Sequence, residues 1–199
     1  MKVLVVAEEA HEREGALPAL IRRLNPAIKD VECEYANAAK VRAFRGKGDG
    51  FYKRALRWLI EAENRGHDAL IFLIDRDGHK NRSQQMDKAQ DNIEGTMLPR
   101  AMGVAVEAFD AWILADPRAL SKVLGCNVQQ QPDPETIKAQ TAKARCVELL
   151  GESQSGLRPR EMYAEVLQTA DLETLGKRYK RGFQPFAERV SNLSSESAE

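Results

Sequence analysis

The chain has 199 residues, of which 43% are hydrophobic and 30% charged, and its 30 basic residues equal its 30 acidic residues. A chain of this size can bury a full hydrophobic core, and this composition excludes a generally disordered protein. The zero net charge removes a globally basic surface as an argument for nucleic-acid binding, although it leaves a local basic patch open.

Targeting and redox features favour the cytoplasm. The sequence has no run of about 18 apolar residues, so we expect no transmembrane helix and no membrane partner. Its first residues lack the long apolar region and the cleavage site of a signal peptide. Cys33, Cys126 and Cys146 are odd in number and form no CxxC pair, which is typical of reduced thiols.

Up to residue 117 the predicted elements alternate between strands and helices. In chain order they are a strand at Lys2–Ala7, a helix at Ala16–Leu24, a weaker strand at Val31–Tyr35, a helix at Phe51–Asn64, a strand at Ala69–Ile74, a helix at Ser83–Glu94, a short strand at Gly103–Val106 and a helix at Ala108–Ala115. This alternation predicts an α/β fold, with a mostly parallel sheet flanked by helices.

After residue 117 every predicted element is helical. A helix-start signal at Asp116-Pro117 is followed by predicted helices at Pro134–Leu150, Arg158–Ala170, Leu172–Tyr179 and Phe183–Val190. We therefore expect an α/β core over residues 1–117 and a helical extension packed on it over residues 118–190. The polar residues 191–199 are expected to form a disordered tail.

Acidic residues follow the two strongest predicted strands at the point where each strand ends. Glu8 follows the first strand, and Asp75 and Asp77 follow the later one. Ligands of open parallel sheets bind beyond the carboxyl ends of the strands, so these side chains converge if the two strands are neighbours. Converging carboxylates repel unless a cation lies between them, and Mg²⁺ or Mn²⁺ prefers oxygen ligands. The alternative is a turn with solvated aspartates.

Two further acids follow the predicted strand Gly103–Val106. Glu107 and Asp110 are three residues apart and share one face if a helix begins there, so they are candidate metal ligands. The alternative is an acidic first helical turn that interacts favourably with the helix dipole.

At these residues the sequence resembles a known family. Glu8 after the first strand and Asp75-x-Asp77 after a later one look like the metal-binding signature of TOPRIM (topoisomerase–primase) domains. Three longer segments, together with ADLETLGKRYKRGFQPFAERV (Ala170–Val190), are similar to a small bacterial TOPRIM-like family of uncharacterised function. These segments are AEEAHE (Ala7–Glu12), LIDRDG (Leu73–Gly78) and VEAFDAWILADP (Val106–Pro117). That family is related to the nuclease half of the overcoming-lysogenisation-defect enzymes.

The resemblance implies a TOPRIM-like (Rossmann-like) fold and a Mg²⁺- or Mn²⁺-dependent nuclease, in bacterial defence or a mobile element. It assigns catalysis and metal binding to Glu8, Glu12, Asp75 and Asp77. Two metal ions about 4 Å apart would serve phosphodiester hydrolysis best, and Asp110 or Glu107 would help to hold the second. The family has glycine where this chain has Glu9, which places a charged side chain beside the metal.

Candidate contacts to nucleic acid are basic residues of two segments: Arg42, Arg45, Lys47 and Lys53 in the segment Arg42–Arg54, and Arg76 and Lys80 around the DxD motif. The segment Arg42–Arg54 also contains three aromatic residues, which can stack on bases. Around the DxD motif, Arg76, His79, Lys80 and Arg82 could place a cation at the scissile phosphate. The alternatives are an exposed loop before a helix and, for Arg76, simple neutralisation of its acidic neighbours.

The alternative function is a non-catalytic adaptor of the same fold that binds nucleic acid or protein. An adaptor gains nothing from clustered acids, which argues against it. A phosphatase of the haloacid-dehalogenase type is excluded because AEEAHE stands where its DxDx[TV] motif would be. The chain has no GxxxxGK[ST] loop, so any regulation by ATP requires a separate ATPase partner. The sequence leaves a homodimer open.

Overall fold

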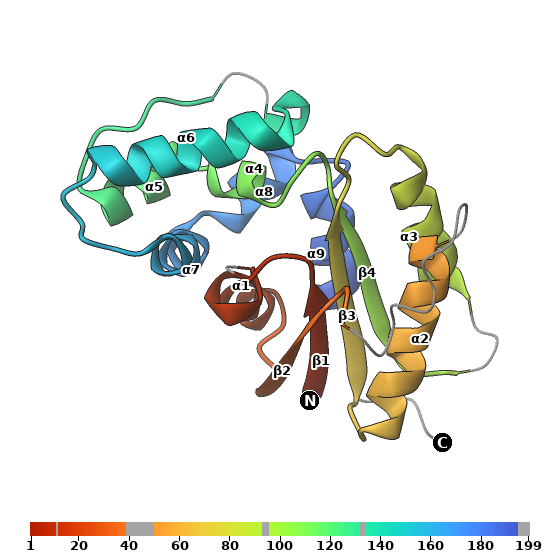
Figure 1. The fold of residues 1–199 in the computed structure, drawn as a ribbon. Coiled ribbons are helices and arrows are strands. Elements are labelled where there is room, and N and C mark those ends of the chain that lie inside the picture. The colour runs from red at the N-terminus through yellow and green to blue at the C-terminus, as the bar shows by residue number, and fades with distance from the viewer. Residues whose placement is uncertain (11, 39–49, 93–95, 132–133, 195–199) are drawn as a thin grey trace.

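The structure, a computed structural model, describes residues 1–10, 12–38, 50–92, 96–131 and 134–194. Within these residues the centre is a four-stranded sheet, in the order β2-β1-β3-β4, whose neighbouring strands all pair in parallel. The strands are β1 (Lys2–Ala7), β2 (Asp30–Tyr35), β3 (Ala69–Asp75) and β4 (Arg100–Ala105). Helices lie on both sides of this sheet (Figure 1), so the predicted α/β class is confirmed.

The helices form three groups around the sheet (Figure 1). One face is covered by α2 (Gly50–Asn64) and α3 (Asn81–Asp91). The other side holds α1 (Leu17–Leu24), α7 (Pro159–Thr169) and α9 (Phe183–Ser191). Beyond the carboxyl ends of the strands lie α4 (Asp110–Ile113), α5 (Pro117–Leu124), α6 (Ala139–Glu152) and α8 (Leu172–Arg178).

After the exposed Lys2, the central strand β1 is apolar from Val3 to Ala7 because both of its faces are buried there. Val3 and Val5 belong to the core shared with α1 and the C-terminal helices, whereas Leu4 and Val6 pack in the core that contains Trp58 of α2. Successive side chains of a strand point to opposite faces, so a strand covered on both sides needs a continuous apolar run. This explains why the sequence predicted β1 and β3 so closely.

The strand order places a topological switch point between the parallel strands β1 and β3, where the connections change from one side of β1 to the other. From β1 the chain passes through α1 to β2 on one side, and then through α2 to β3 on the other side. In open α/β sheets such a switch point opens a crevice beyond the carboxyl ends of the two central strands, where ligands bind. Glu8 and Asp75 stand at these two ends.

Strand β4 begins at Arg100, before the predicted start at Gly103. Arg100 is 9% exposed, and its guanidinium donates hydrogen bonds to the carbonyl oxygens of Asn92, Thr96 and Leu98. The backbone therefore compensates a buried charge inside the strand. A search for apolar runs cannot find a strand that begins in this way.

Three predicted helices have clearly different limits in the structure. Helix α3 begins at Asn81 instead of Ser83 and ends at Asp91, and residues 93–94 of the prediction lie outside the described residues. The predicted helix Pro134–Leu150 is divided into a short 3-10 turn at Pro134–Thr136 and helix α6, which starts at Ala139. The predicted helix Ala108–Ala115 is reduced to the four residues of α4.

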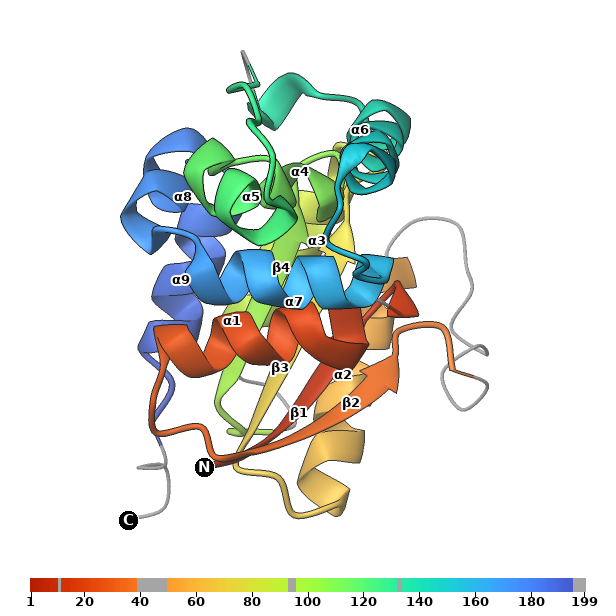
Figure 2. The same cartoon turned by 90° about the vertical axis from the view of Figure 1, so that its left-hand side faces the viewer.

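The helical half of the chain returns to the sheet. Helix α9 packs on β4, and α7 runs beside α1 (Figure 2). The side-chain amide of Asn25 donates to the carbonyl oxygens of Val190 and Leu193 at 3.0 and 2.9 Å. Leu193 is 7% exposed. Order therefore continues to Ser194 where a disordered tail was expected, and residues 195–199 lie outside the described residues.

The structure also bears on the expectations about membrane-spanning helices and cysteines. Within the described ranges, no helix has both the length and the apolar character needed to cross a bilayer. The three cysteines are all described and all free, and Cys146 is buried.

Gly103 allows β4 and α9 to approach closely. A Cβ atom added there would lie 2.4 Å from Cδ2 of Phe186, a fully buried ring. Gly103→Ala is therefore expected to lower the free energy of unfolding by about 1–3 kcal/mol, measured by urea denaturation. Gly151→Ala is the control, because nothing lies within 4 Å of the added Cβ. A larger loss at Gly151 than at Gly103 would contradict this packing.

Candidate active site

Glu8 and Asp75 meet beyond the carboxyl ends of β1 and β3. Oε2 of Glu8 accepts a hydrogen bond from the backbone N–H of Asp75 at 3.0 Å, which joins the ends of the two strands. Oδ1 of Asp75 accepts one from the backbone N–H of Phe109 at 2.8 Å, which joins β3 to the segment after β4. The pairing of β1 with β3 thus brings these two sequence-predicted acids together.

Glu12 is the most deeply buried acid of this group. It lies in η1 (Glu12–Ala16), a short, kinked π-helical segment before α1, and is 1% exposed. Its Oε2 accepts a hydrogen bond from the backbone N–H of Glu9 at 3.3 Å, whereas its Oε1 has no hydrogen-bond partner among the described residues. A buried carboxylate oxygen without a donor is unfavourable for folding, so stability alone does not account for Glu12 at this position.

Burial raises the pKa of all three acids. The pKa of Glu12 lies well above its usual value because of burial, and the charges of Asp75 and Glu8 raise it further. Burial also raises the pKa of Asp75 well above its usual value, although the hydrogen bond from the backbone of Phe109 lowers it. Burial raises the pKa of Glu8, although the hydrogen bond from Asp75 and the charge of Arg82 act in the opposite direction. The fold thus holds these acids together despite their repulsion.

Asp77 and Glu107 have strained backbone conformations. Their φ angles are 47° and 65°, in the left-handed region that residues other than glycine rarely adopt. The two residues contact each other, because the backbone N–H of Asp77 donates to the carbonyl oxygen of Glu107 at 3.1 Å. Such strain clusters at functional sites, where the surrounding structure maintains it.

The structure pairs Glu107 with Arg76. The guanidinium of Arg76 donates a hydrogen bond to the carboxylate of Glu107, and both side chains are largely buried. Arg76 was predicted to contact nucleic acid and Glu107 to bind metal. Their mutual ion pair instead matches the alternative in which Arg76 neutralises an acidic neighbour.

Asp110 is held by the helical half of the chain. It is 4% exposed, and its carboxylate accepts a hydrogen bond from the hydroxyl of Tyr163 in α7. The thiol of Cys146 in α6 donates to the Asp110 carbonyl oxygen at 3.7 Å. The charge of Asp110 raises the pKa of Asp75, so the two acids are electrostatically coupled. No sequence motif pointed to Tyr163, because this contact joins residues 53 positions apart.

Tyr163→Phe is expected to lower the free energy of unfolding by about 1–3 kcal/mol, because the buried Asp110 carboxylate loses its hydroxyl donor. Equilibrium unfolding in urea measures the loss. Tyr35→Phe on the edge strand β2, where the side chain is 39% exposed, is the control and should change stability by less than about 0.5 kcal/mol. Equal losses in both variants would argue against the assigned role of Tyr163.

Helix α7 also holds the segment that carries Glu12. A Cβ atom added at Gly15 of η1 would lie 3.2 Å from Cβ of Ala164 in α7, so the two backbones approach closely. Arg160 of α7 forms an ion pair with Glu14 at 3.1 Å. The placement of Glu12 in the site therefore depends on a helix from the distant C-terminal half of the chain.

Two of the predicted nucleic-acid contacts differ in exposure from Arg82, the cation beside the acids. Lys53 and Lys80 are exposed, as contact to nucleic acid requires. Arg82 is different, because its Nη1 lies among the acids, 3.0 Å from Oδ2 of Asp77 and 3.5 Å from Oε2 of Glu8. The other predicted contacts, Arg42, Arg45 and Lys47, lie outside the described residues.

The donor atoms at this site suit a hard divalent cation. Carboxylate oxygens are the ligands that Mg²⁺ and Mn²⁺ prefer, and Oε1 of Glu12 is a buried oxygen with no donor among the described residues. Within the same part of the chain, no three acidic, histidine or cysteine side chains are already arranged to hold a metal ion. The chemistry of the donors therefore fits a metal ion, but their present arrangement does not form a complete site.

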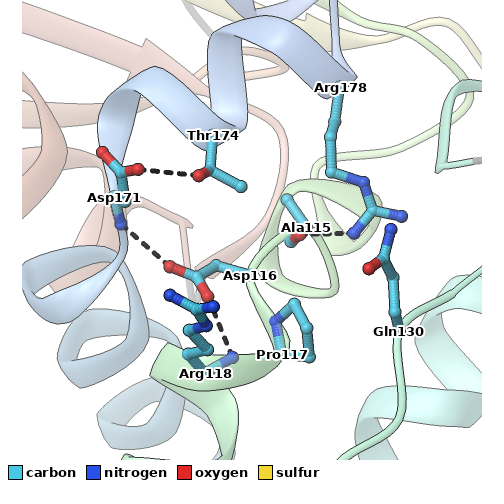
Figure 3. Close-up of a pocket in the computed structure, with 8 residues that line it drawn as sticks. All are labelled: Ala115, Asp116, Pro117, Arg118, Gln130, Asp171, Thr174 and Arg178. Carbon is cyan, nitrogen blue, oxygen red and sulfur yellow. Dashed lines mark hydrogen bonds between the residues drawn. The ribbon is translucent and has the colours of Figure 1, made fainter.

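A pocket of about 310 Å³ lies between α5 and α8 (Figure 3) and contains none of the four candidate catalytic acids. Asp116 accepts hydrogen bonds there from the backbone N–H groups of Arg118 and Asp171. Arg178 donates to the carbonyl oxygen of Ala115 at 2.5 Å. These polar groups join α5 to α8, which gives the pocket wall a structural role.

Comparison with known proteins gives no match to a family model, to a curated protein or to a solved structure. The TOPRIM-like identity therefore stays an expectation from the sequence. The function is inferred from the residues of this chain and their placement.

Proposed function

We propose that this protein is a TOPRIM-like nuclease that hydrolyses phosphodiester bonds of nucleic acid with Mg²⁺ or Mn²⁺. The observation that carries the proposal is the convergence of Glu8, Glu12 and Asp75 beyond the carboxyl ends of β1 and β3. One oxygen of the buried Glu12 has no donor among the described residues. Buried acids that the fold holds close together despite their mutual repulsion are typical of catalytic and metal-binding sites.

In this proposal the ion is held by Glu8, Glu12, Asp75 and Asp77. A bound divalent ion polarises a phosphoryl oxygen and makes water a nucleophile at neutral pH. The chain supplies the orientation, because backbone N–H groups fix the carboxylates of Glu8 and Asp75.

Asp110 and Glu107 have supporting roles. Asp110 is bonded to Tyr163, and Glu107 is paired with Arg76. Each acid therefore orients the segment that follows β4, which also provides the N–H group that holds Asp75.

The choice of nucleic acid as substrate is supported by the TOPRIM-like resemblance and by two exposed cations. Lys53 and Lys80 lie at the start of α2 and directly before α3, and both can contact phosphates. A role in bacterial defence or a mobile element, and the need for a separate ATPase, rest on the resemblance alone.

The test compares the wild-type protein with Asp75→Asn on supercoiled plasmid and on structured RNA, in Mn²⁺, Mg²⁺ or EDTA. Asparagine keeps the oxygen that accepts the hydrogen bond from Phe109, so the variant should fold. We expect metal-dependent cleavage by the wild type and a loss of at least about 100-fold in the variant.

Asp91→Asn is the matched control, because Asp91 is an exposed aspartate at the end of α3. It should cleave like the wild type. Cleavage that persists in EDTA or in Asp75→Asn would contradict the proposal. A folded wild-type protein that binds nucleic acid but cleaves neither polymer in any metal would favour the adaptor function.

A further inference from the structure

Arg82 occupies the centre of the acidic site. Besides its contacts to Asp77 and Glu8 at 3.0 and 3.5 Å, its Nη1 donates to the carbonyl oxygen of Asp75. The Arg82 side chain extends from the first turn of α3 and is 13% exposed. One positive charge therefore lies where the acids at the ends of β1 and β3 face one another.

The guanidinium of Arg82 has a second support that does not involve the acids. Its Cζ lies 4.5 Å from the ring centroid of Phe51, and Cζ of Arg54 lies at the same distance from that ring. Both are cation–π contacts. Phe51 is fixed in turn, because its backbone N–H donates to Oε1 of Gln85 at 2.8 Å. Arg82 can therefore release its oxygen contacts and still rest against Phe51.

We propose that Arg82 is a resident cation of the acidic site and that a divalent metal ion displaces it from Glu8 and Asp77. The inference rests on the proposed function, because it concerns the same acids. The guanidinium and a metal ion compete for the same oxygens, and two cations at the same oxygens repel each other.

Two consequences follow for the metal-free protein. Arg82 offsets part of the repulsion between Glu8 and Asp77 while no ion is bound. It also draws the carboxylates of Glu8 and Asp77 toward itself, so both must leave Arg82 before they bind an ion.

A titration of the protein with Mn²⁺ tests this competition without any substrate. Electron paramagnetic resonance measures the free Mn²⁺ that remains. Arg82→Gln should bind Mn²⁺ at least about tenfold more tightly than the wild type, since a charge in direct contact changes such equilibria by tenfold or more. Lys88→Gln removes an exposed positive charge from the same helix α3 and is the control. It should change the affinity by less than about threefold, because solvent and salt screen it.

A wild-type protein that binds Mn²⁺ as tightly as Arg82→Gln, or more tightly, would overturn the role of Arg82 and leave the proposed metal site intact. If neither the wild type nor the folded variant binds Mn²⁺, the proposed function fails as well. Thermal unfolding in EDTA shows whether each variant folds.

Arg82→Lys replaces Arg82→Gln in this test if the glutamine variant does not fold, because lysine keeps the charge but cannot reproduce the planar contacts of the guanidinium. It should bind Mn²⁺ severalfold more tightly than the wild type, and equal or weaker binding would overturn the proposal.

Discussion

Replacement of Glu12 by glutamine is expected to remove most of the cleavage activity and, at the same time, to stabilise the metal-free protein. The carboxylate is 1% exposed, and one of its oxygens has no hydrogen-bond donor within the described residues. Glutamine keeps an oxygen for the N–H of Glu9, and its amide group can donate to the neighbouring acids. We expect cleavage to fall at least about 100-fold, and the free energy of unfolding at pH 8 in EDTA to rise by about 1–2 kcal/mol.

The stability gain of Glu12→Gln should depend on pH. Because burial raises the pKa of Glu12 in the folded protein, its contribution to stability is complete below the usual pKa of about 4.3 and is lost as the pH rises through the raised value. The variant lacks this titration. The difference in unfolding free energy between variant and wild type should therefore be small near pH 4 and largest at pH 8, as measured by urea denaturation in EDTA.

Glu14→Gln is the matched control for this experiment. Glu14 lies in the same η1 segment, but its side chain is 49% exposed and its partner is Arg160 on the surface of α7. It should retain cleavage and show no gain in stability at pH 8. If Glu12→Gln destabilises the protein at pH 8, or cleaves like the wild type, the proposed role of Glu12 is wrong.

The second large effect is expected at Trp112, which is fully buried in α4. Its ring lies 5.3 Å from those of Phe109 and Phe183 and 5.7 Å from that of Phe186, measured between centroids. Trp112→Ala removes the centre of this aromatic cluster and should lower the free energy of unfolding by about 3–5 kcal/mol. Most domains have a total stability of only about 5–15 kcal/mol, so this loss is severe.

Trp112→Phe keeps an aromatic ring in the cluster and so measures how much of the loss in Trp112→Ala comes from ring packing. The indole Nε1 is buried and has no hydrogen-bond partner among the described residues, so phenylalanine removes volume without breaking a hydrogen bond. We expect a loss of less than about 2 kcal/mol, measured by urea denaturation. Equal losses in the two variants would show that the ring does not stabilise this cluster. Since Phe109 also holds Asp75 through its backbone N–H, the alanine variant should also reduce cleavage.

Much of the fold is encoded in local patterns. Continuous apolar runs predicted β1 and β3 because these strands are covered on both faces, and helical spacing predicted α1 and α2. The same reasoning missed the start of β4, where Arg100 is buried with carbonyl oxygens as partners. It also did not predict that ordered structure continues past α9 to the buried Leu193.

The residues of the candidate site were likewise predicted only in part. The sequence identified Glu8, Asp75 and Asp77, because acids that directly follow buried strands can be recognised from local order alone. It did not separate Asp110 and Glu107, which pair with Tyr163 and Arg76, from the acids that converge at the ends of β1 and β3.

The sequence by itself determined which segments become strands and helices and which acids stand at the strand ends, since both depend on neighbouring residues along the chain. Only the tertiary structure decided that β1 lies beside β3, that α7 packs against the segment of Glu12, and that Arg82 lies between Glu8 and Asp77. Arg82 and Asp77 are only five positions apart, but the other contacts join positions far apart in the sequence. Their formation depends on how the buried surfaces of separate elements fit together, and no local pattern encodes that fit.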